Sequence, residues 1–307
     1  MYYFIVNPNA RHGLGEKIWK KLERRIIHSG IEYEVQMTRG QGDARRLAAE
    51  LTENSEGPHT IIAVGGDGTV NEILNGLSFD GPVTLGYIPT GSGNDLARSL
   101  RLPKSPARCL KRVLSPRYYR CLDYGILSYE KEAPVHRRFI VSSGIGMDAA
   151  VCHDLLDTGR KRRLLLFGGR LRYVLLGIKH LVLTKPVKGH LVLDGVKKVE
   201  FNHIYFISSH IHPYEGGGFK FSPKADYNDG QLEVCVVHNS SKRHLVPVLA
   251  DALTGRMGHH RGVRFYRCKE MAVHVDRPLP VHVDGESCFC QTDIHLRCVE
   301  KKLRMIV

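Results

Sequence analysis

The sequence predicts an N-terminal α/β domain followed by an all-β domain. Strand and helix patterns alternate over the first third of the 307-residue chain and are joined by short loops. After about residue 122 they give way to short runs rich in valine, isoleucine and aromatic residues, with turn residues between them. The first pattern is typical of an open, doubly wound and mostly parallel sheet, and the second is typical of a β-sandwich or a barrel.

Each element of the first domain follows from local periodicity. The expected strands are apolar or alternating runs, over 2–6, 32–37, 61–64 and 84–88. The expected helices carry apolar residues three or four positions apart, over 16–29, 43–52, 70–77 and 94–100. Gly30 is a stop signal after the first helix, and Gln41-Gly42-Asp43 resembles a cap before the second.

The second domain is expected to contain short strands and one basic helix. The strand-like runs lie at 137–144, 189–195, 203–210, 230–238, 270–275 and 280–286, and the helical segment lies at roughly 155–183. The chain has no internal repeat and no low-complexity linker, so we expect two closely packed domains, over 1–122 and 123–294. Residues 295–307 either return to the first domain, which we favour, or support a dimer.

The composition favours anionic partners. Lys and Arg number 45 against 31 Asp and Glu, which gives a net charge of +14. A helix-turn-helix, an RNP-type aromatic strand and a zinc finger are all missing from the sequence, so nucleic acid is not the expected partner. The eight cysteines are scattered without a C-x-x-C pair, and neither a signal peptide nor a membrane-spanning run is visible. We therefore expect a cytoplasmic protein with reduced thiols.

A glycine-rich loop follows the third expected strand. The run IIAVGGDGTVNEILNGL leaves the strand through Gly65, Gly66, Asp67 and Gly68 and restarts as a helix at Val70. Glycines allow a ligand to approach the backbone, and the amides of a helix N-terminus suit a phosphate. Asp67 would repel a phosphate directly, so it either organises the loop or faces a Mg²⁺ ion. The alternative is a plain strand-to-helix turn, which three glycines fit poorly.

A second loop of the same kind follows the next strand. YIPTGSGNDLAR (87–98) passes through Gly91 and Gly93 and begins a helix near Asn94. Both loops would line the crevice beyond the carboxyl ends of neighbouring strands. Neither matches the P-loop pattern, and Gly144-Ile145-Gly146 is only a weak dinucleotide-type match that we interpret as packing in the second domain.

These motifs together resemble the catalytic domain of the diacylglycerol kinase superfamily. The chain is especially similar to small soluble bacterial lipid kinases, which also resemble sphingosine and ceramide kinases. The resemblance covers most of the chain and rests on five motifs in order: NPNARHG (7–13), Thr38 in MTRGQGDARRLA, the two glycine loops, PKADYNDGQLEV (223–234) and VDGE (283–286). Because GGDGT is shared with phosphofructokinases and NAD kinases, an N-terminal domain of that fold is implied.

The resemblance implies ATP as the phosphoryl donor, held by the strand ends and the glycine loops of the first domain. The residues implied in nucleotide binding are Asn7, Pro8, Thr38, Gly65, Gly66, Asp67, Gly68, Thr69, Val70, Asn71, Gly91, Ser92, Asn94 and Asp95. Two positions depart from the family pattern. The first loop has Asn9-Ala10-Arg11-His12 before Gly13 instead of a small residue and glycine, and Ser92 replaces a common threonine but keeps the hydroxyl.

The motif VDGE is implied to supply the catalytic acids. Asp284 and Glu286 alternate, so in a strand they would share one face. One of them would act as general base on a lipid hydroxyl, with family analogy favouring Glu286, and the other would orient the base or hold Mg²⁺. The alternative from spacing alone is a D-G hairpin turn with solvated acids.

A second, structural Mg²⁺ site is implied at Asp226 and Asp229, with a main-chain carbonyl near Gln231. The alternative is an Asn-Asp-Gly turn between strands, and the two are compatible. His210 and His212, like the pair His259-His260, lack a third ligand of convincing spacing, so we do not predict a metal there.

The basic segment 159–182 carries seven Lys and Arg among long apolar residues. It either binds an anionic membrane surface or packs its leucines on the second domain, and both roles are compatible. We therefore predict an ATP- and Mg-dependent lipid kinase at the membrane surface, with diacylglycerol as the first expected substrate and phosphatidic acid as the product. The alternatives are a kinase of a sphingoid base or another lipid alcohol, and a catalytically silent lipid- or nucleotide-binding regulator. Monomer and homodimer both stay open.

Overall fold

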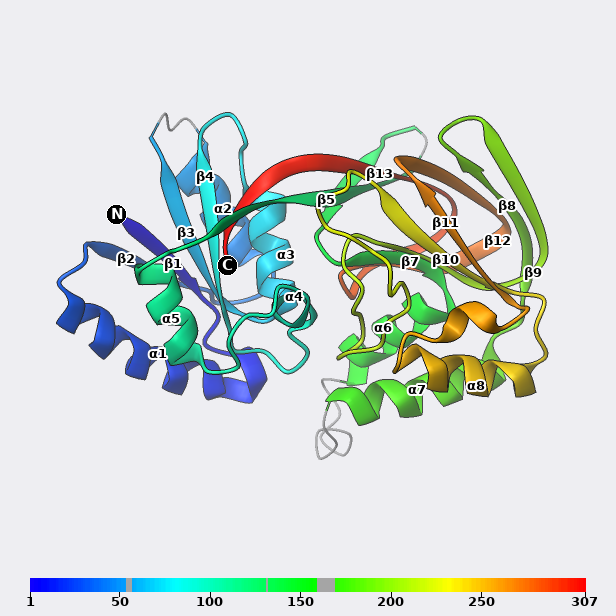
Figure 1. Ribbon diagram of the computed structural model, residues 1–307, viewed down its shortest axis with the longest axis horizontal. Coiled ribbons are helices and arrows are strands. Elements are labelled where there is room, and N and C mark those ends of the chain that lie inside the picture. The colour runs from blue at the N-terminus through cyan, green and yellow to red at the C-terminus, as the bar shows by residue number, and fades with distance from the viewer. Residues whose placement is uncertain (54–56, 131, 159–168) are drawn as a thin grey trace. The chain divides into compact units, whose positions relative to one another are not determined.

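The computed structural model describes residues 1–53, 57–130, 132–158 and 169–307 (Figure 1). The chain forms two compact units. Unit 1 comprises residues 1–122 together with 301–307, and unit 2 comprises residues 123–300. The chain is mixed α/β with many strands, and the prediction of a mixed chain built in two parts is confirmed.

Unit 1 is built around a parallel sheet. Its strands lie in the order β13-β4-β3-β1-β2, and each pairs in parallel with its neighbours. The bounds are β1 (Tyr2–Val6), β2 (Tyr33–Met37), β3 (His59–Gly65), β4 (Val83–Pro89) and β13 (Glu286–Ile306). The end of β13 joins this sheet through Arg304 opposite Thr84 and Met305 opposite Leu85.

Helices cover both faces of this sheet. They are α1 (Ala10–Ser29), α2 (Asp43–Thr52), α3 (Asp67–Gly76), the short α4 (Asp95–Ser99) and α5 (Pro106–Leu114). Phe4 and Ile62 pack in one core with Trp19 of α1 and Leu110 of α5. Ile5, the next residue along β1, points to the opposite face and is equally buried. A layer of side chains therefore lies on each side of the strands.

Two helix predictions in unit 1 need correction. The first helix begins at Ala10, not at residue 16. Its first turns contain Gly13 and Gly15 and lack an apolar stripe, so their helical character is not visible in the sequence. Gly15 lies so close to the Asn7 and Pro8 carbonyls that a side chain there would overlap them, so this glycine serves packing. Helix α5 was not predicted, although Pro106 at its start is a usual first-turn residue.

Unit 2 is antiparallel. Its strands are β5 (Tyr119–Tyr129), β6 (Val135–Phe139), β7 (Ser142–Gly146), β8 (Val187–Leu193), β9 (Lys197–His210), β10 (Leu232–His238), β11 (Val263–Cys268), β12 (Glu270–Val283) and most of β13. The long strands β9 and β12 each pair with β7 along one part and with β8 along another. Side chains such as Ile145, Leu191, Ile207 and Val281 fill the core that these strands surround.

A second core of unit 2 lies beneath helices. Met147 of α6 (Met147–Thr158), Tyr173 and Leu176 of α7 (Gly169–Leu183) and Leu245 of α8 (Lys242–Ala252) pack there with Phe206 of β9. The expected single helix over 155–183 is therefore wrong at its start, because α6 begins directly after β7. Helix α8 was also missed, since Pro247 lies inside it and interrupts the helical pattern.

Candidate active site

The predicted nucleotide-binding residues of unit 1 gather at the carboxyl ends of its parallel strands. The Asn7 amide donates to Val64 O at 2.9 Å, and the Thr38 amide donates to Val6 O at 2.8 Å. Gly65 at the end of β3 is in register with Pro89 at the end of β4. Residues that are far apart in the sequence thus follow adjacent strand ends, where open parallel sheets bind ligands.

The two glycine loops touch each other through their backbones. The amides of Thr90 and Gly91 both donate to Gly65 O, at 2.7 and 3.2 Å. A Cβ atom on Gly91 would lie only 2.6 Å from the Cα of Gly66. Glycine is therefore required at 91, because a larger residue would push the loops apart.

Asp67 joins the two loops. Its Oδ2 accepts the Asp95 amide at 2.8 Å, and its Oδ1 accepts the Leu96 amide at 3.3 Å. The Tyr87 hydroxyl lies 3.4 Å from Asp67 Oδ1 and 3.2 Å from Asn94 Oδ1. Burial, with Asp67 adding to it, raises the pKa of Tyr87 well above its usual value, so this hydroxyl stays protonated and can donate. The carboxylate therefore organises the loop, one of the two roles considered from sequence.

Thr69 is fixed between the first loop and the strand. Asn7 Nδ2 donates to Thr69 Oγ1 at 3.2 Å, and the Thr69 side chain packs so closely on Gly65 that any side chain at 65 would overlap it. A hydroxyl that accepts one hydrogen bond still has its own hydrogen to donate. Thr69 can therefore serve an anion at the start of α3.

The remaining predicted residues divide into supporting and exposed positions. Val70 and Asn71 are buried within α3, and the Val70 amide donates to Gly66 O at 3.2 Å. Asn94 has a left-handed backbone (φ 53°), and its Nδ2 donates to Gly91 O at 2.8 Å. Ser92 is exposed, and Pro8 is partly exposed. Val70 and Asn71 thus support the loop from within, whereas Ser92 is accessible to a ligand.

The expectation that Asp284 and Glu286 share one face of a strand is wrong. Strand β12 ends at Val283, which pairs directly with Glu286 at the start of β13. The two residues between them have left-handed backbones, with φ 47° at Asp284 and 86° at Gly285. The alternative was a D-G hairpin turn with solvated acids: the turn is confirmed, but a solvated Asp284 is wrong, because its carboxylate accepts backbone amides. The physical reason for the turn is that Asp-Gly tolerates positive φ at both central positions, which such turns require.

The Asp284 carboxylate is tied to a neighbouring segment. Oδ2 accepts the Ile140 amide at 2.8 Å, and Oδ1 accepts the amides of Val141 and Ser142 at 2.8 and 3.0 Å. The Asp284 amide in turn donates to Ser142 O at 2.8 Å. These bonds fix the turn against the start of β7. Glu286 is partly exposed at the first pair of β13.

The predicted metal loop is held in place from beneath by Asp123, which sequence reasoning missed. Asp123 is fully buried, its Oδ2 accepts the Gly230 amide at 2.7 Å, and its own amide donates to Tyr227 O at 2.8 Å. Asp226 and Asp229 are both exposed. Their carboxylates are hard oxygen donors and fit Mg²⁺.

The predicted metal loop is not a short hairpin. Strand β9 ends at His210 and β10 begins only at Leu232, so the Asn-Asp-Gly turn lies within a longer connection. Arg267 Nη1 lies 3.9 Å from Asp229 Oδ2, and its guanidinium supplies part of the positive charge that the acids need.

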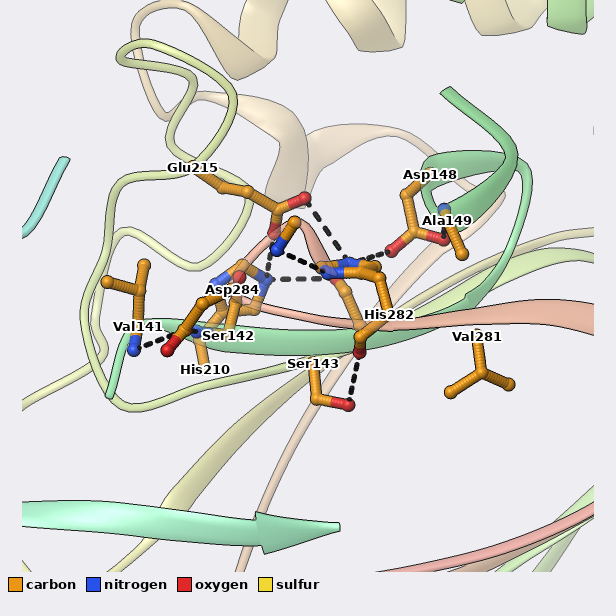
Figure 2. Close-up of polar contacts among 12 residues, drawn as sticks. Val141, Ser142, Ser143, Asp148, Ala149, His210, Glu215, Val281, His282 and Asp284 are labelled. Atoms are coloured by element: carbon orange, nitrogen blue, oxygen red, sulfur yellow. Dashed lines mark hydrogen bonds and ion pairs between the residues drawn. The ribbon is translucent and has the colours of Figure 1, made fainter. Parts of the chain in front are cut away.

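Sequence reasoning also missed a buried polar cluster in unit 2, which Figure 2 shows. His282 Nε2 on β12 lies 3.5 Å from Asp148 Oδ2 of α6 and 3.6 Å from Glu215 Oε1. His210 Nε2 on β9 lies 3.7 Å from Glu215 Oε2. All four side chains are almost completely buried. They come from three separate segments of the sequence, and the local signals were the pair His210 and His212 and an acid beside three glycines in YEGGG.

Two groups of side chains in the described part of the chain have the composition of metal ligands. Cys152, Glu215 and His282 offer three atoms within 4.8 Å of one another, and so do Asp251, His259 and His260. In the second group, which is partly exposed, Asp251 Oδ2 lies 2.8 Å from His260 Nε2 and 3.3 Å from His259 Nε2. In the first group the burial of His282 lowers its pKa, but Asp148 and Glu215 outweigh burial and raise it above its usual value, so both acids favour a hydrogen on the nitrogen that faces them.

A parallel sheet with touching glycine loops at its carboxyl edge is typical of α/β domains that bind phosphate-bearing ligands, and in this chain an antiparallel unit follows it. Residues 1–120 match the diacylglycerol kinase catalytic domain, and residues 140–307 match the YegS C-terminal NAD kinase beta sandwich-like domain. The chain therefore belongs to the diacylglycerol kinase family of lipid kinases. Membership implies ATP and a lipid as the two substrates.

Relatives agree with this assignment, and a solved structure shares the fold. A diacylglycerol kinase of Mycobacterium tuberculosis is 27% identical over 304 residues, 98% of this chain and 93% of that protein. A probable YegS-like lipid kinase of Chromohalobacter salexigens is 30% identical, over 92% of this chain and 83% of that protein. A diacylglycerol kinase crystal structure from Bacillus anthracis has the same fold, with a TM-score of 0.73, 20% identity and coverage of 99% and 96% of the two chains.

Within the described residues, none of the helices combines the length and apolar character that crossing a membrane requires.

Proposed function

We propose that this protein transfers the γ-phosphoryl group of ATP to the hydroxyl of diacylglycerol, giving phosphatidic acid. The single observation that carries the proposal is the contact between the two glycine loops at the carboxyl edge of the parallel sheet. Gly66 and Gly91 approach so closely that the backbones of the two loops form one continuous surface. An anionic triphosphate is the ligand that such a backbone surface suits.

Unit 1 is the proposed nucleotide-binding domain, and unit 2 the proposed lipid and metal domain. In unit 1 the phosphates would lie on the first amides of α3 and on the Thr69 hydroxyl, with Ser92 contributing from the second loop. Asp67 would not touch the phosphates, because its oxygens already accept the Asp95 and Leu96 amides. Its proposed role is to keep both loops in register.

Glu286 is the proposed general base. Asp284 is engaged by three amides, so its oxygens are committed to holding the turn, whereas Glu286 follows the turn and is partly exposed. A base placed beside a lipid hydroxyl would remove its proton as phosphoryl transfer proceeds. Asp284 would position this base through the turn.

Mg²⁺ is the proposed cofactor. Asp226, Asp229 and the Gln231 carbonyl would hold a structural ion, which would neutralise the acids of that loop. A Mg²⁺ ion bound with ATP would neutralise the charge that phosphoryl transfer concentrates on the phosphate oxygens. The chain's own contribution is to hold the acceptor, orient the base and exclude water.

The proposed membrane contact involves helix α7. Leu175, Ile178 and Val182 recur at helical spacing and are 42%, 51% and 65% exposed, while Tyr173 and Leu176 are buried in the core. The helix thus has one apolar face in the protein and another at the surface, so both sequence interpretations have support. The basic residues 160–163 of the predicted membrane segment lie outside the described residues. An exposed apolar helix face suits the interfacial layer of a bilayer.

The test is incubation with γ-labelled ATP, Mg²⁺ and a lipid panel in mixed micelles, with the Glu286→Gln variant as control. Label in phosphatidic acid from diacylglycerol, absent from the variant, is the expected result. Label in a sphingoid base or another lipid alcohol instead would correct the substrate. If the wild-type protein labels no lipid but still binds ATP, the silent-regulator alternative replaces the proposal.

A further inference from the structure

His282 has a hydrogen-bonding pattern that fixes its tautomer. Its Nδ1 faces the Gly285 amide at 3.2 Å, and an amide N–H can only donate. For this hydrogen bond Nδ1 must accept, so the bond belongs to the neutral ring that carries its hydrogen on Nε2. Gly285 is the second residue of the turn that leads from Asp284 to Glu286, so the ring directly contacts the proposed catalytic turn.

The other side of the ring faces two buried acids. Nε2 lies 3.5 Å from Asp148 Oδ2 and 3.6 Å from Glu215 Oε1, so this nitrogen faces two acceptors among buried side chains (Figure 2). Asp148 lies in the first turn of α6, where the helix N-terminus favours a negative charge. The acids thus favour the hydrogen on Nε2 that the Gly285 amide already requires.

The surrounding packing leaves the ring little freedom. A Cβ atom on Gly144 would overlap Asp148 Oδ2 and would lie 2.9 Å from His282 Nε2, so glycine at this position makes room for the pair. Ser143 Oγ donates to His282 O at 2.8 Å and fixes the backbone. On the far side, the Tyr173 hydroxyl lies 3.5 Å from Glu215 Oε1. Each neighbour of the ring is itself held by another element.

A metal ion is the competing explanation, since Cys152, Glu215 and His282 could together supply ligands. An ion bound to Nε2 of a neutral imidazole would leave the ring hydrogen on Nδ1. That hydrogen would point at the Gly285 amide, which is itself a donor. The hydrogen bond from Gly285 therefore favours a ring whose Nε2 hydrogen faces the acids over one that binds a metal.

We propose that His282 is a positioning residue for phosphoryl transfer. Held between Asp148 and Glu215, it presents Nδ1 to the Gly285 amide and so fixes the half of the turn that leads into Glu286. The Asp284 carboxylate fixes the other half through its three amide bonds. The proposal rests on the proposed function, because it assumes that Glu286 acts in catalysis.

Two substitutions separate the two sides of the ring. In His282→Asn the side-chain oxygen can replace Nδ1 and still accept from Gly285, while the contact with the acids is lost. In His282→Gln the longer amide can still donate to Asp148 and Glu215, while the acceptor for Gly285 is lost. If His282 served only the fold, the activity of the two variants would follow their thermal stability. Asn is the smaller residue and leaves the larger space in the core, so His282→Asn would then be the less stable and the less active variant.

We expect the order of the two variants in thermal stability to be the opposite of their order in activity. We expect His282→Gln to be the more stable variant and yet to lose kcat by about tenfold to hundredfold, with KM for ATP unchanged. A displacement of the general base by about 1 Å has an effect of that size. We expect His282→Asn to keep kcat within a few-fold of wild type. Equal losses, or losses that follow the melting temperature, would overturn the proposal.

A second measurement does not depend on activity. Hydrogen exchange of the peptide that contains Gly285 should stay slow in wild type and His282→Asn and become faster in His282→Gln. If the wild-type protein phosphorylates no lipid but this order is seen, the proposed function fails and the contact stands. Unchanged exchange in His282→Gln, or one equivalent of bound zinc in wild type that His282→Asn loses, would refute the positioning role.

Discussion

Asp67 in unit 1 and Asp284 in unit 2 both precede a glycine in a motif that resembles the family's, and both accept backbone amides of another segment. Asp67 lies in the first turn of α3 and accepts the amides of Asp95 and Leu96 at the start of α4. Asp284 lies in a turn between two strands and accepts three amides that precede or begin β7. In both units the acid of the motif first serves to hold neighbouring chain in place.

The difference between the two acids lies in what each one holds. Asp67 joins two loops whose glycine backbones touch, so it shapes a surface for an anion. Asp284 fixes a turn that ends at Glu286, so it orients a side chain. Under the proposed function, the same interaction supports nucleotide binding in unit 1 and catalysis in unit 2.

The largest expected effect concerns the acids of unit 2. Glu286→Gln should lower kcat by roughly 10²- to 10⁴-fold, the usual contribution of a general base, without changing the melting temperature. Asp284→Asn removes an acceptor for at least one amide and should lower stability by about 1–3 kcal/mol, with a smaller loss of kcat. Lipid phosphorylation and thermal melts measure both. A stable but inactive Asp284→Asn together with an active Glu286→Gln would reverse the assignment.

The next effect concerns the glycine contact of unit 1. In Gly91→Ala the new Cβ would lie 2.6 Å from the Cα of Gly66, so the loops must separate. We expect KM for ATP to rise by about tenfold to hundredfold, as displaced binding groups commonly cause. Gly40→Ala is the matched control, because a Cβ there meets nothing within 4 Å. Equal ATP kinetics for the two variants would show that the loop contact does not shape the site.

Acid should affect unit 2 before unit 1. Burial lowers the pKa of His210 and of His212 to about 3, and both lie in unit 2. Because their unfolded pKa is near 6.5, unfolding takes up protons below that pH. The free energy of unfolding is therefore not reduced by these histidines above pH 6.5. Below pH 6.5 it falls by about 1.4 kcal/mol per pH unit for each histidine, down to about pH 3.

Trp19, the single tryptophan of the chain, is buried in unit 1, so its fluorescence reports the unfolding of unit 1 alone. Its fluorescence should change at lower pH than far-UV circular dichroism, which reports both units. His212→Phe should reduce the pH dependence of unfolding, while His295→Asn, at a partly exposed position, should change it much less. Coincident transitions in the wild-type protein would contradict a separate acid sensitivity of unit 2.

The smallest expected effect is at the surface of unit 2. Ile178→Asp in α7 should weaken flotation with anionic liposomes by a few-fold, because it places a negative charge on the apolar face. Val196→Asp, at an 88% exposed position in the connection between β8 and β9, is the control. Added salt should weaken wild-type binding as well. Binding that neither Ile178→Asp nor salt affects would place the membrane contact elsewhere.

The sequence predicted well those features that local patterns determine. The glycine exits after β3 and β4 are visible because three glycines around an acid are rare in an ordinary turn. Parallel pairing then places such exits side by side, since adjacent strands end at the same edge. The strand-rich second half was equally visible from its alternating apolar runs.

The sequence could not reveal features that depend on distant contacts. Asp284 and Glu286 fit an alternating strand as well as a turn, and only pairing of Val283 with Glu286 decides between them. The contacts of His282 join residues on three separate segments of unit 2, and Asp123 looks like an ordinary strand residue until its bond to Gly230 is seen. Local periodicity carries no information about such long-range partners.

Strand β13 has one consequence for handling the protein. Its last residues pair with β4, and Met305 and Ile306 are buried in unit 1. A fragment ending at Leu122 would leave β4 with bare amides and carbonyls along one side and a gap in its core. Such an open edge invites self-association, so the isolated first unit should aggregate unless a peptide spanning 301–307 is added back to complete it.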